Sequence, residues 1–146
     1  MIIYIRIRSF VIRKILCNYL NIILIFVFHV GIADIPNALE TVKALKKHKD
    51  FTISNPNRAR SLISSFAANM AHFHKSDGTG YEFIADCVLE LDALNPQVAS
   101  RLVGTFSSWR RYDEGRQALM KAQLEKISQK EGLSKDTFEV VSRSLK

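Results

Sequence analysis

The chain has 146 residues, enough for one domain with a modest core and too few for two. A composition of 47% hydrophobic and 24% charged residues excludes a disordered chain, and two cysteines exclude a disulfide scaffold and a four-cysteine zinc site. The formal charge of +7 is divided between four basic residues that precede Asp34, the first acidic residue, and a nearly balanced remainder, so we expect no nucleic acid as a partner.

Residues 1–32 form an apolar head that differs from the rest of the chain. The stretch from Ile15 to Ala33 carries no charge over 19 residues, which is just long enough for a helix to span a bilayer. Basic residues precede it, as they precede a signal sequence or a membrane anchor. Three interpretations of this predicted apolar helix stay open: a membrane anchor through residues 15–33, a cleaved signal peptide, or an artefact of the gene model. A real head predicts a membrane-associated chain; without it, the chain would be cytoplasmic or organellar.

After the head, helix start signals follow one another along the chain. Asn37 and Glu40 have the spacing of a capping box, in which each side chain bonds the backbone N–H of the other residue. The pairs Asn55-Pro56 and Asn95-Pro96 place a capping Asn before a proline at the first helical position. Further N-caps are expected at Asp77 or Thr79, at Asp113 and at Ser134, and Gly132 is expected to close the helix before the last one.

Apolar side chains follow each of these start signals at helical spacing, and no stretch alternates long enough to predict a strand. Each predicted helix is therefore expected to bury one face. In chain order these faces are Leu39, Val42 and Leu45; Leu62, Ile63 and Phe66; Tyr81, Ile84, Val88 and Leu91; Leu102, Val103 and Phe106; Leu119, Met120, Leu124 and Ile127; and Phe138, Val141 and Leu145.

The two Asn-Pro start signals lie 40 residues apart. Helix pairs that recur with a period of about 40 residues are typical of HEAT and armadillo repeats. The sequence therefore predicts an all-α body of stacked helical hairpins, a piece of a HEAT- or armadillo-like α-solenoid, preceded by the apolar N-terminal helix.

Motifs that would carry catalysis are absent from the sequence. It has no His-Glu-x-x-His, no Cys-x-x-Cys and no phosphate loop. His72 and His74, two residues apart, would face different sides of a helix, so we expect no zinc pair there. Residues 109–112 mix two Arg residues with Trp and Tyr. We interpret them as a helix end whose aromatic rings pack and whose Arg residues pair with Asp113 and Glu114, and nucleic-acid contact is the weaker alternative.

The body also contains long strings in a fixed order. They are residues 55–63 (NPNRARSLI), 73–83 (FHKSDGTGYEF), 91–101 (LDALNPQVASR) and 109–117 (WRRYDEGRQ), and residues 133–145 (LSKDTFEVVSRSL) close the chain. These strings resemble the C-terminal end of the aminopeptidase N family, the bacterial- and plant-type alanyl aminopeptidases, which are gluzincin zinc metallopeptidases. Because the resemblance runs from about Ala33 to Lys146, residues 33–146 are expected to form part of the family's C-terminal helical domain.

The resemblance implies a function for a larger enzyme. Family members remove N-terminal residues from peptides with a zinc ion, and their zinc ligands, general-base Glu and Gly-x-Met-Glu-Asn motif lie in parts that this sequence does not match. The chain would thus hold no cofactor and be inactive alone, with zinc in the full-length enzyme. It would form outer helices of a bowl that covers the active site and restricts access to peptides. Its implied partners are the rest of the aminopeptidase and a peptide substrate.

Two site residues, Arg60 and Arg101, also follow from the resemblance, because family members turn some Arg side chains of the bowl toward the substrate cavity. Guanidinium groups can hold peptide carbonyls or a carboxylate by charge-assisted hydrogen bonds. Both Arg residues are expected early in their helices, soon after an Asn-Pro pair. The alternative is that each one pairs with an acidic residue and only shapes the wall.

A second function of a different class stays open, a stand-alone α-solenoid module that binds peptides or proteins and is tethered to a membrane by the head. The helix around Val42 is expected to expose apolar surface, because it would pack against earlier helices in a complete bowl. The body is therefore expected to be marginally stable and prone to associate.

Overall fold

The computed structural model describes residues 37–146, and the fold and site below concern that part of the chain. Its helices are α3 (Ala38–Lys46), α4 (Pro56–Ala59), the π-helical turn η2 (Arg60–Ser64), α5 (Ser65–Ala68), α6 (Met70–Phe73), α7 (Thr79–Asp92), α8 (Pro96–Val103), the 3-10 turns η3 (Gly104–Phe106) and η4 (Trp109–Arg111), α9 (Glu114–Ser128) and α10 (Lys135–Leu145). Residues 37–146 contain no strand, as predicted.

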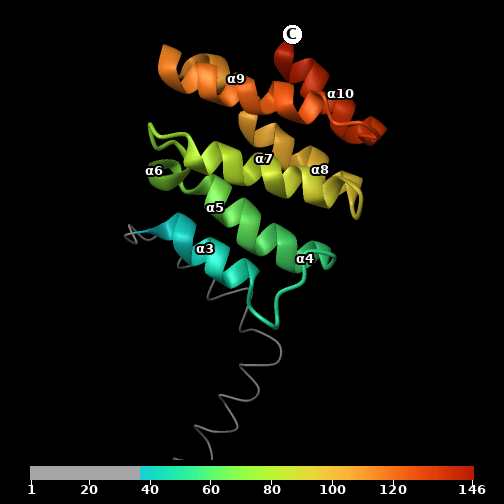
Figure 1. Cartoon of the computed structure of the whole chain (residues 1–146). Helices are drawn as coiled ribbons and strands as arrows, with labels where there is room; N and C mark the ends of the chain where they lie inside the picture. Colours follow the sequence, from blue (N-terminus) through green and yellow to red (C-terminus); the bar gives the residue numbers. More distant parts are fainter. Residues whose placement is uncertain (1–36) are drawn as a thin grey trace, which may run out of the picture.

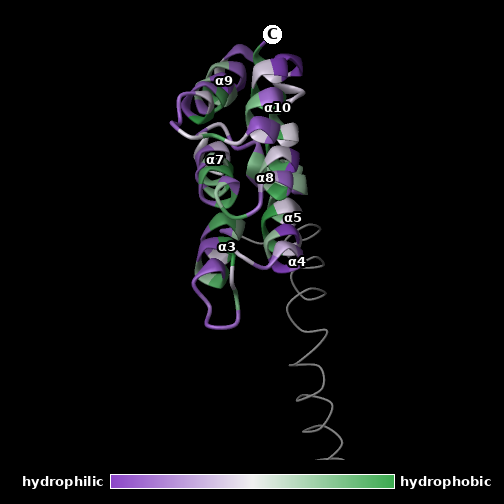
Figure 2. Cartoon of the chain, turned by 90° about the vertical axis from the view of Figure 1, so that its right-hand side faces the viewer, coloured by the Kyte–Doolittle hydropathy of each residue, from purple (hydrophilic) through white to green (hydrophobic). Residues whose placement is uncertain are grey.

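The helices stack in two layers (Figures 1 and 2). The A layer consists of α3, α7 and α9, and the B layer consists of the continuous α4–η2–α5 segment, α8 and α10. Each A helix is followed along the chain by a B helix, so the layers are built from successive hairpins. The helix α7 packs against α8 and α9, and α10 packs against α8 and α9. This arrangement confirms the predicted stack of helical hairpins.

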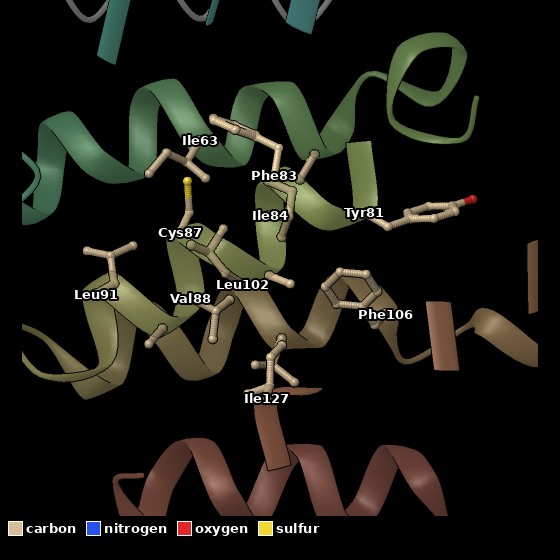
Figure 3. Packing of buried hydrophobic residues seen from close by; sticks show 14 of the residues in the cluster. Ile63, Tyr81, Phe83, Ile84, Cys87, Val88, Leu91, Leu102, Phe106 and Ile127 are labelled. Carbon is tan, nitrogen blue, oxygen red and sulfur yellow. The ribbon is translucent and has the colours of Figure 1, made fainter. Parts of the chain in front are cut away.

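The core lies between the two layers (Figure 3). Most of the predicted apolar faces are buried in it, and its largest fully buried side chains are Tyr81, Phe66, Phe73, Phe106, Leu62, Ile63, Ile84, Leu91, Leu102, Met120, Leu124 and Ile127. Leu39, Leu45, Leu119 and Leu145 are partly buried and pack against its edge. One core therefore runs through all the helix pairs.

Val42 is fully buried, as predicted for its face, because α3 packs against η2 and α5 and directs Val42 into the common core. One burial prediction is wrong. Phe138 is 53% exposed instead of buried. It lies on the outer side of α10, and only Val141 of its predicted face is fully buried, since α10 contacts α8 and α9 on one side alone.

The predicted N-caps hold at four helix starts. In each case the side-chain oxygen accepts a hydrogen bond from a backbone N–H of the first turn, and the capping residues are Asn55, Asn95, Asp113 and Ser134. The two prolines after Asn55 and Asn95 occupy the first helical position, where the missing N–H costs no hydrogen bond.

The capping box predicted at Asn37 is wrong. Asn37 has φ 67° and ψ 37°, in the left-handed region, and its side chain makes no capping hydrogen bond. The Glu40 carboxylate, which the box would direct back to Asn37, instead accepts a bond from Lys43 Nζ at 3.0 Å. The local ion pair along the helix thus replaces the reciprocal cap.

The start of α7 and the end of α9 differ from prediction by a few residues. Gly78, with φ 73°, is the N-cap of α7, and Asp77 Oδ1 accepts a bond from the Thr79 backbone N–H at 3.0 Å. The expected carboxylate therefore serves the helix start from one position before the cap. The helix α9 ends at its C-cap Gln129, so Gly132, with φ 71°, is a left-handed residue of the following turn and does not close α9.

The C-terminal end of α7 holds the N-terminal end of α10. Asp92 is only 3% exposed, and its carboxylate accepts bonds from the Ser134 backbone N–H at 2.9 Å and from the Ser134 hydroxyl at 2.5 Å. Burial alone would raise the pKa of Asp92, but the hydrogen bonds from Ser134 hold it below its ordinary value. Asp92 therefore joins an A helix to a B helix as a buried carboxylate.

No helix within residues 37–146 has the length and apolar character needed to cross a membrane. The predicted apolar helix and the membrane anchor through residues 15–33 lie outside the described residues.

Candidate functional site

Charged side chains of the A layer pair between neighbouring helices. Lys46 of α3 donates to Glu90 of α7, with Nζ and Oε2 2.5 Å apart. Lys126 of α9 donates to Asp86 of α7, with Nζ and Oδ1 2.7 Å apart. The middle helix of the layer thus supplies carboxylates that are neutralised by lysines from the helices on both sides.

The B layer carries its charge differently. Residues 56–68 and 96–106, which form its first two helices, contain no Asp or Glu. Arg60 and Arg101 are both exposed, and neither guanidinium forms an ion pair or a hydrogen bond with a residue among 37–146. Within the described part of the chain, the pairing with an acidic residue that would make each Arg a wall element is therefore not formed.

The structure places the two predicted site residues on consecutive helices of one layer. Arg60 opens the π-helical turn η2, five positions after the Asn55 cap, and Arg101 lies in the last α-helical turn of α8. The expectation that both lie early in their helices is wrong for Arg101, because the α-helical part of this segment ends at Val103 and continues as a 3-10 turn. Single π-helical turns occur frequently at functional sites, and Arg60 is the first residue of such a turn.

Two hydroxyl groups of the second B-layer helix bond within that helix. The Ser100 hydroxyl donates to the Gln97 carbonyl at 3.1 Å, and the Thr105 hydroxyl donates to the Leu102 carbonyl at 2.7 Å. Such bonds satisfy the hydroxyl locally. In the first two B helices, Arg58 already donates to the Asp50 carbonyl, and the guanidinium groups of Arg60 and Arg101 are the charged donors without a partner among residues 37–146. Their chemistry suits carboxylates and peptide carbonyls.

A second polar cluster joins the turn after α6 to the start of α9. His74 Nδ1 lies 2.8 Å from the Tyr81 hydroxyl, and His74 Nε2 lies 2.9 Å from the Tyr112 hydroxyl. The rings of His74 and Tyr112 stack with centroids 4.2 Å apart. Arg116 Nε donates to the His74 carbonyl at 2.7 Å and its NH1 to Asp113 Oδ2 at 2.6 Å. Burial and the nearby Arg116 lower the pKa of His74.

No local pattern in the sequence indicates this cluster, because His74 and Tyr112 are 38 positions apart and only the packing of α7 against α9 brings them together. His72, the other histidine of the considered pair, is buried. Among residues 37–146, no three His, Cys, Asp or Glu side chains are grouped as a metal site would need.

The segment of residues 109–112 holds the end of α10. Trp109 is 9% exposed, and its Nε1–H donates to the Ser144 carbonyl at 2.8 Å. Arg110 donates to the carbonyls of Ser144 and Leu145, and its guanidinium carbon lies 4.4 Å from the centre of the Trp109 ring. The packing of the aromatic ring is confirmed.

The predicted pairing of these Arg residues with Asp113 and Glu114 is wrong. Arg110 binds the last carbonyls of α10, which lack donor partners within the helix and attract a cation, while Asp113 pairs with Arg116. The segment therefore acts as a helix cap in this structure.

A family model described as "Domain of unknown function (DUF3458_C) ARM repeats" matches residues 26–146. The chain belongs to this family. It is 48% identical to aminopeptidase N of Escherichia coli over 110 residues and 50% identical to aminopeptidase N of Caulobacter vibrioides over 111 residues. Each match covers 75% of this chain and 13% of the relative. The chain therefore spans about an eighth of the length of these relatives.

A solved structure agrees with these relatives. The crystal structure of Legionella pneumophila aminopeptidase A in complex with aspartic acid superposes with a TM-score of 0.73 and 37% identity, over 79% of this chain and 13% of that chain. The predicted resemblance to the C-terminal helical domain of the aminopeptidase N family is confirmed. The ARM-repeat description also agrees with the two-layered stack of hairpins.

Proposed function

We propose that the chain forms part of the C-terminal helical bowl of a zinc-dependent aminopeptidase, which removes N-terminal residues from peptides. In this function it covers the active site and shapes the access of peptides, and it is not catalytic alone. The observation that carries the proposal is the identity of 48% and 50% to two aminopeptidases N over three quarters of the chain. The rest of such an enzyme is the partner, and it would hold the zinc ion.

The B layer is the face that we assign to the peptide. Arg60 and Arg101 are exposed, unpaired within residues 37–146, and carried by helices without carboxylates. A peptide presents carbonyl oxygens and carboxylates, which are the acceptors that a guanidinium binds best. The A layer suits this task less well, since its Lys46 and Lys126 already bind carboxylates of α7.

A chimeric enzyme tests this function. The C-terminal segment of E. coli aminopeptidase N that matches this chain is replaced by residues 37–146, and the release of N-terminal residues from peptides is measured with and without a zinc chelator. We expect chelator-sensitive activity from the chimera and none from the chain alone. A folded chimera without activity, or a chain that is active alone, would contradict the proposal.

Variants of the chimera test the two Arg residues separately. Arg60→Ala and Arg101→Ala are expected to raise KM for peptides several-fold while leaving kcat for a single-residue chromogenic substrate nearly unchanged. Arg111→Ala is the matched control, because Arg111 is an exposed cation of η4 outside the B layer. An equal rise of KM in Arg111→Ala would show that only net charge matters.

A stand-alone binding module is the second candidate, and the single core that runs from Val42 to Val141 favours it. Such a core lets the described residues fold without another domain. Peptide binding by the full chain with an Arg60- and Arg101-dependent affinity, together with an inactive chimera, would favour this function. The membrane tether belongs to the same proposal and depends on residues 15–33. Extraction of the full chain from vesicles by alkaline carbonate would exclude an integral anchor.

A further inference from the structure

The cluster of His74, Tyr81, Tyr112 and Arg116 connects two hairpins of the stack at one end. His74 follows α6, Tyr81 belongs to α7, Tyr112 follows η4, and Arg116 belongs to the first turn of α9. Gln117 reinforces the α9 side, since its Nε2 donates to the Tyr112 carbonyl at 2.7 Å. The imidazole of His74 thus contacts both hairpins, through Tyr81 on one side and Tyr112 on the other.

A neutral imidazole satisfies this cluster. It has one N–H donor and one acceptor nitrogen, and a tyrosine hydroxyl can donate or accept. With hydroxyls 2.8 Å and 2.9 Å from the two ring nitrogens, one tyrosine accepts from the ring and the other donates to it. Either neutral tautomer of His74 can therefore make both hydrogen bonds.

A protonated imidazole fits the same cluster less well. Both ring nitrogens become donors, so both hydroxyls must accept, and the hydroxyl hydrogen that pointed to the ring loses its acceptor. Around the ring, α7 contributes the hydroxyl of Tyr81, and the first turn of α9 contributes the Arg116 cation, which pairs with Asp113. Burial and the Arg116 charge together disfavour the protonated ring. Burial raises the pKa of Tyr81 to about 12, so this hydroxyl stays uncharged. The turn that follows His74 carries the exposed Lys75 and Asp77, whose charges are opposite.

We propose that His74, Tyr81 and Tyr112 form a pH-sensitive clasp, which ties the turn between α6 and α7 to the start of α9 while His74 is neutral and releases it when His74 is protonated. The clasp contains none of the B-layer Arg residues, so it stands apart from the proposed peptide site. The ligand that operates the switch is the proton that binds His74.

The direction of the pH effect follows from the sign of the pKa shift. The pKa of His74 lies below its ordinary value of 6.5 in the folded chain, so the open or unfolded chain binds the proton more readily. The stability from the clasp is fully present above pH 6.5. It is lost as the pH falls below 6.5 toward the lower pKa of the folded chain.

Hydrogen exchange of the full chain tests the clasp. Exchange is followed by mass spectrometry at pH 7.5 and pH 5.5, with rates corrected for the intrinsic effect of pH on amide exchange. We expect protection of residues 70–81 and 112–117 to fall several-fold at pH 5.5, while that of residues 96–103 in α8 stays within error. Equal protection of the clasp segments at both pH values would overturn the proposal.

Variants separate the clasp from a general acid effect. His74→Gln removes the titrating group and is expected to abolish the pH-dependent difference. Tyr112→Phe keeps the stacked ring, loses one hydrogen bond, and is expected to lower protection already at pH 7.5. His48→Gln is the matched control, because His48 is exposed at the end of α3, and it should respond to pH as the original chain does. A pH response that survives in His74→Gln overturns the proposal.

A direct titration gives a readout that does not depend on the folding of any substituted chain. The side-chain resonances of His74 are followed by NMR in the unsubstituted full chain as the pH is lowered. A midpoint below 6.5, accompanied by shifts of the Tyr112 ring resonances, supports the clasp. A midpoint at or above 6.5 overturns it.

Discussion

The two layers of the stack differ in how they use charge. In the A layer, carboxylates of α7 bind lysines of α3 and α9, so neighbouring helices are tied together at the surface. In the B layer, the first two helices have no carboxylates, and Arg60 and Arg101 have no partner within residues 37–146. Both layers are built from the same helical hairpins around one core. A repeat scaffold can therefore use one face for cohesion and leave the other free to bind.

Removing the carboxylate that joins the layers is expected to have the largest effect on stability. Asp92→Ala leaves the α10 start without its acceptor and a buried space behind, so the free energy of unfolding should fall by about 3 kcal/mol. Urea unfolding of the full chain measures this. Because the pKa of Asp92 is lowered in the fold, its contribution is present above pH 3.8 and is lost as the pH falls below it.

Glu82→Gln is the control for Asp92→Ala, since Glu82 is an exposed carboxylate of the same helix. Its effect should stay within about 0.5 kcal/mol. If the two substitutions cost the same, Asp92 does not join the layers in the way described.

Replacing a glycine by alanine is expected to change stability differently in the two layers, because the space around Gly80 is filled and the space around Gly104 is open. A Cβ at Gly80 in α7 would lie 2.6 Å from the Phe73 carbonyl oxygen, so Gly80→Ala should destabilise the chain by about 2 kcal/mol. Gly104, which follows α8, has helical backbone angles, and nothing lies within 4 Å of the position that a Cβ would take there. Gly104→Ala should leave stability unchanged or raise it slightly, by about 0.5 kcal/mol. Thermal unfolding of both variants tests the contrast, and a destabilised Gly104→Ala would remove it.

The ion pairs of the A layer are expected to give the smallest effect. Lys126 and Asp86 are about half exposed, so the coupling energy of the pair from a double-mutant cycle should be about 0.5 kcal/mol and should fall at high salt. Urea unfolding of Arg60→Ala should show no loss of free energy of unfolding, because Arg60 has no partner among the described residues. A stability loss in Arg60→Ala equal to that of Lys126→Ala would show that the two faces do not differ in this respect.

Much of the fold could be predicted from local patterns. Asn55, Asn95, Asp113 and Ser134 cap helices where the sequence predicts caps, since a side-chain cap depends on a few neighbouring residues. The capping box at Asn37 failed because Glu40 had a nearer partner in Lys43. Phe138 has the spacing of a buried residue, and only the position of α10 at the end of the stack places it outside.

The candidate site was less accessible to sequence reasoning. Arg60 and Arg101 follow from a resemblance. The absence of Asp and Glu from residues 56–68 and 96–106 excludes acidic partners within their own helices, but the sequence does not tell whether another helix supplies one. The layer that each Arg joins decides this, and the layer depends on helix order along the whole body. His74 and Arg110 show the same limit, because their partners lie 38 and 35 positions away in the chain. A contact between distant segments leaves no periodic signal.

The bond between Trp109 and the Ser144 carbonyl also provides an optical signal. The sequence contains a single tryptophan, and its indole is almost fully buried beside the end of α10. Undocking of α10 would expose that indole to water, so its fluorescence emission should shift to longer wavelength. The emission of this one side chain therefore reports whether the last helix is in place, without any added label.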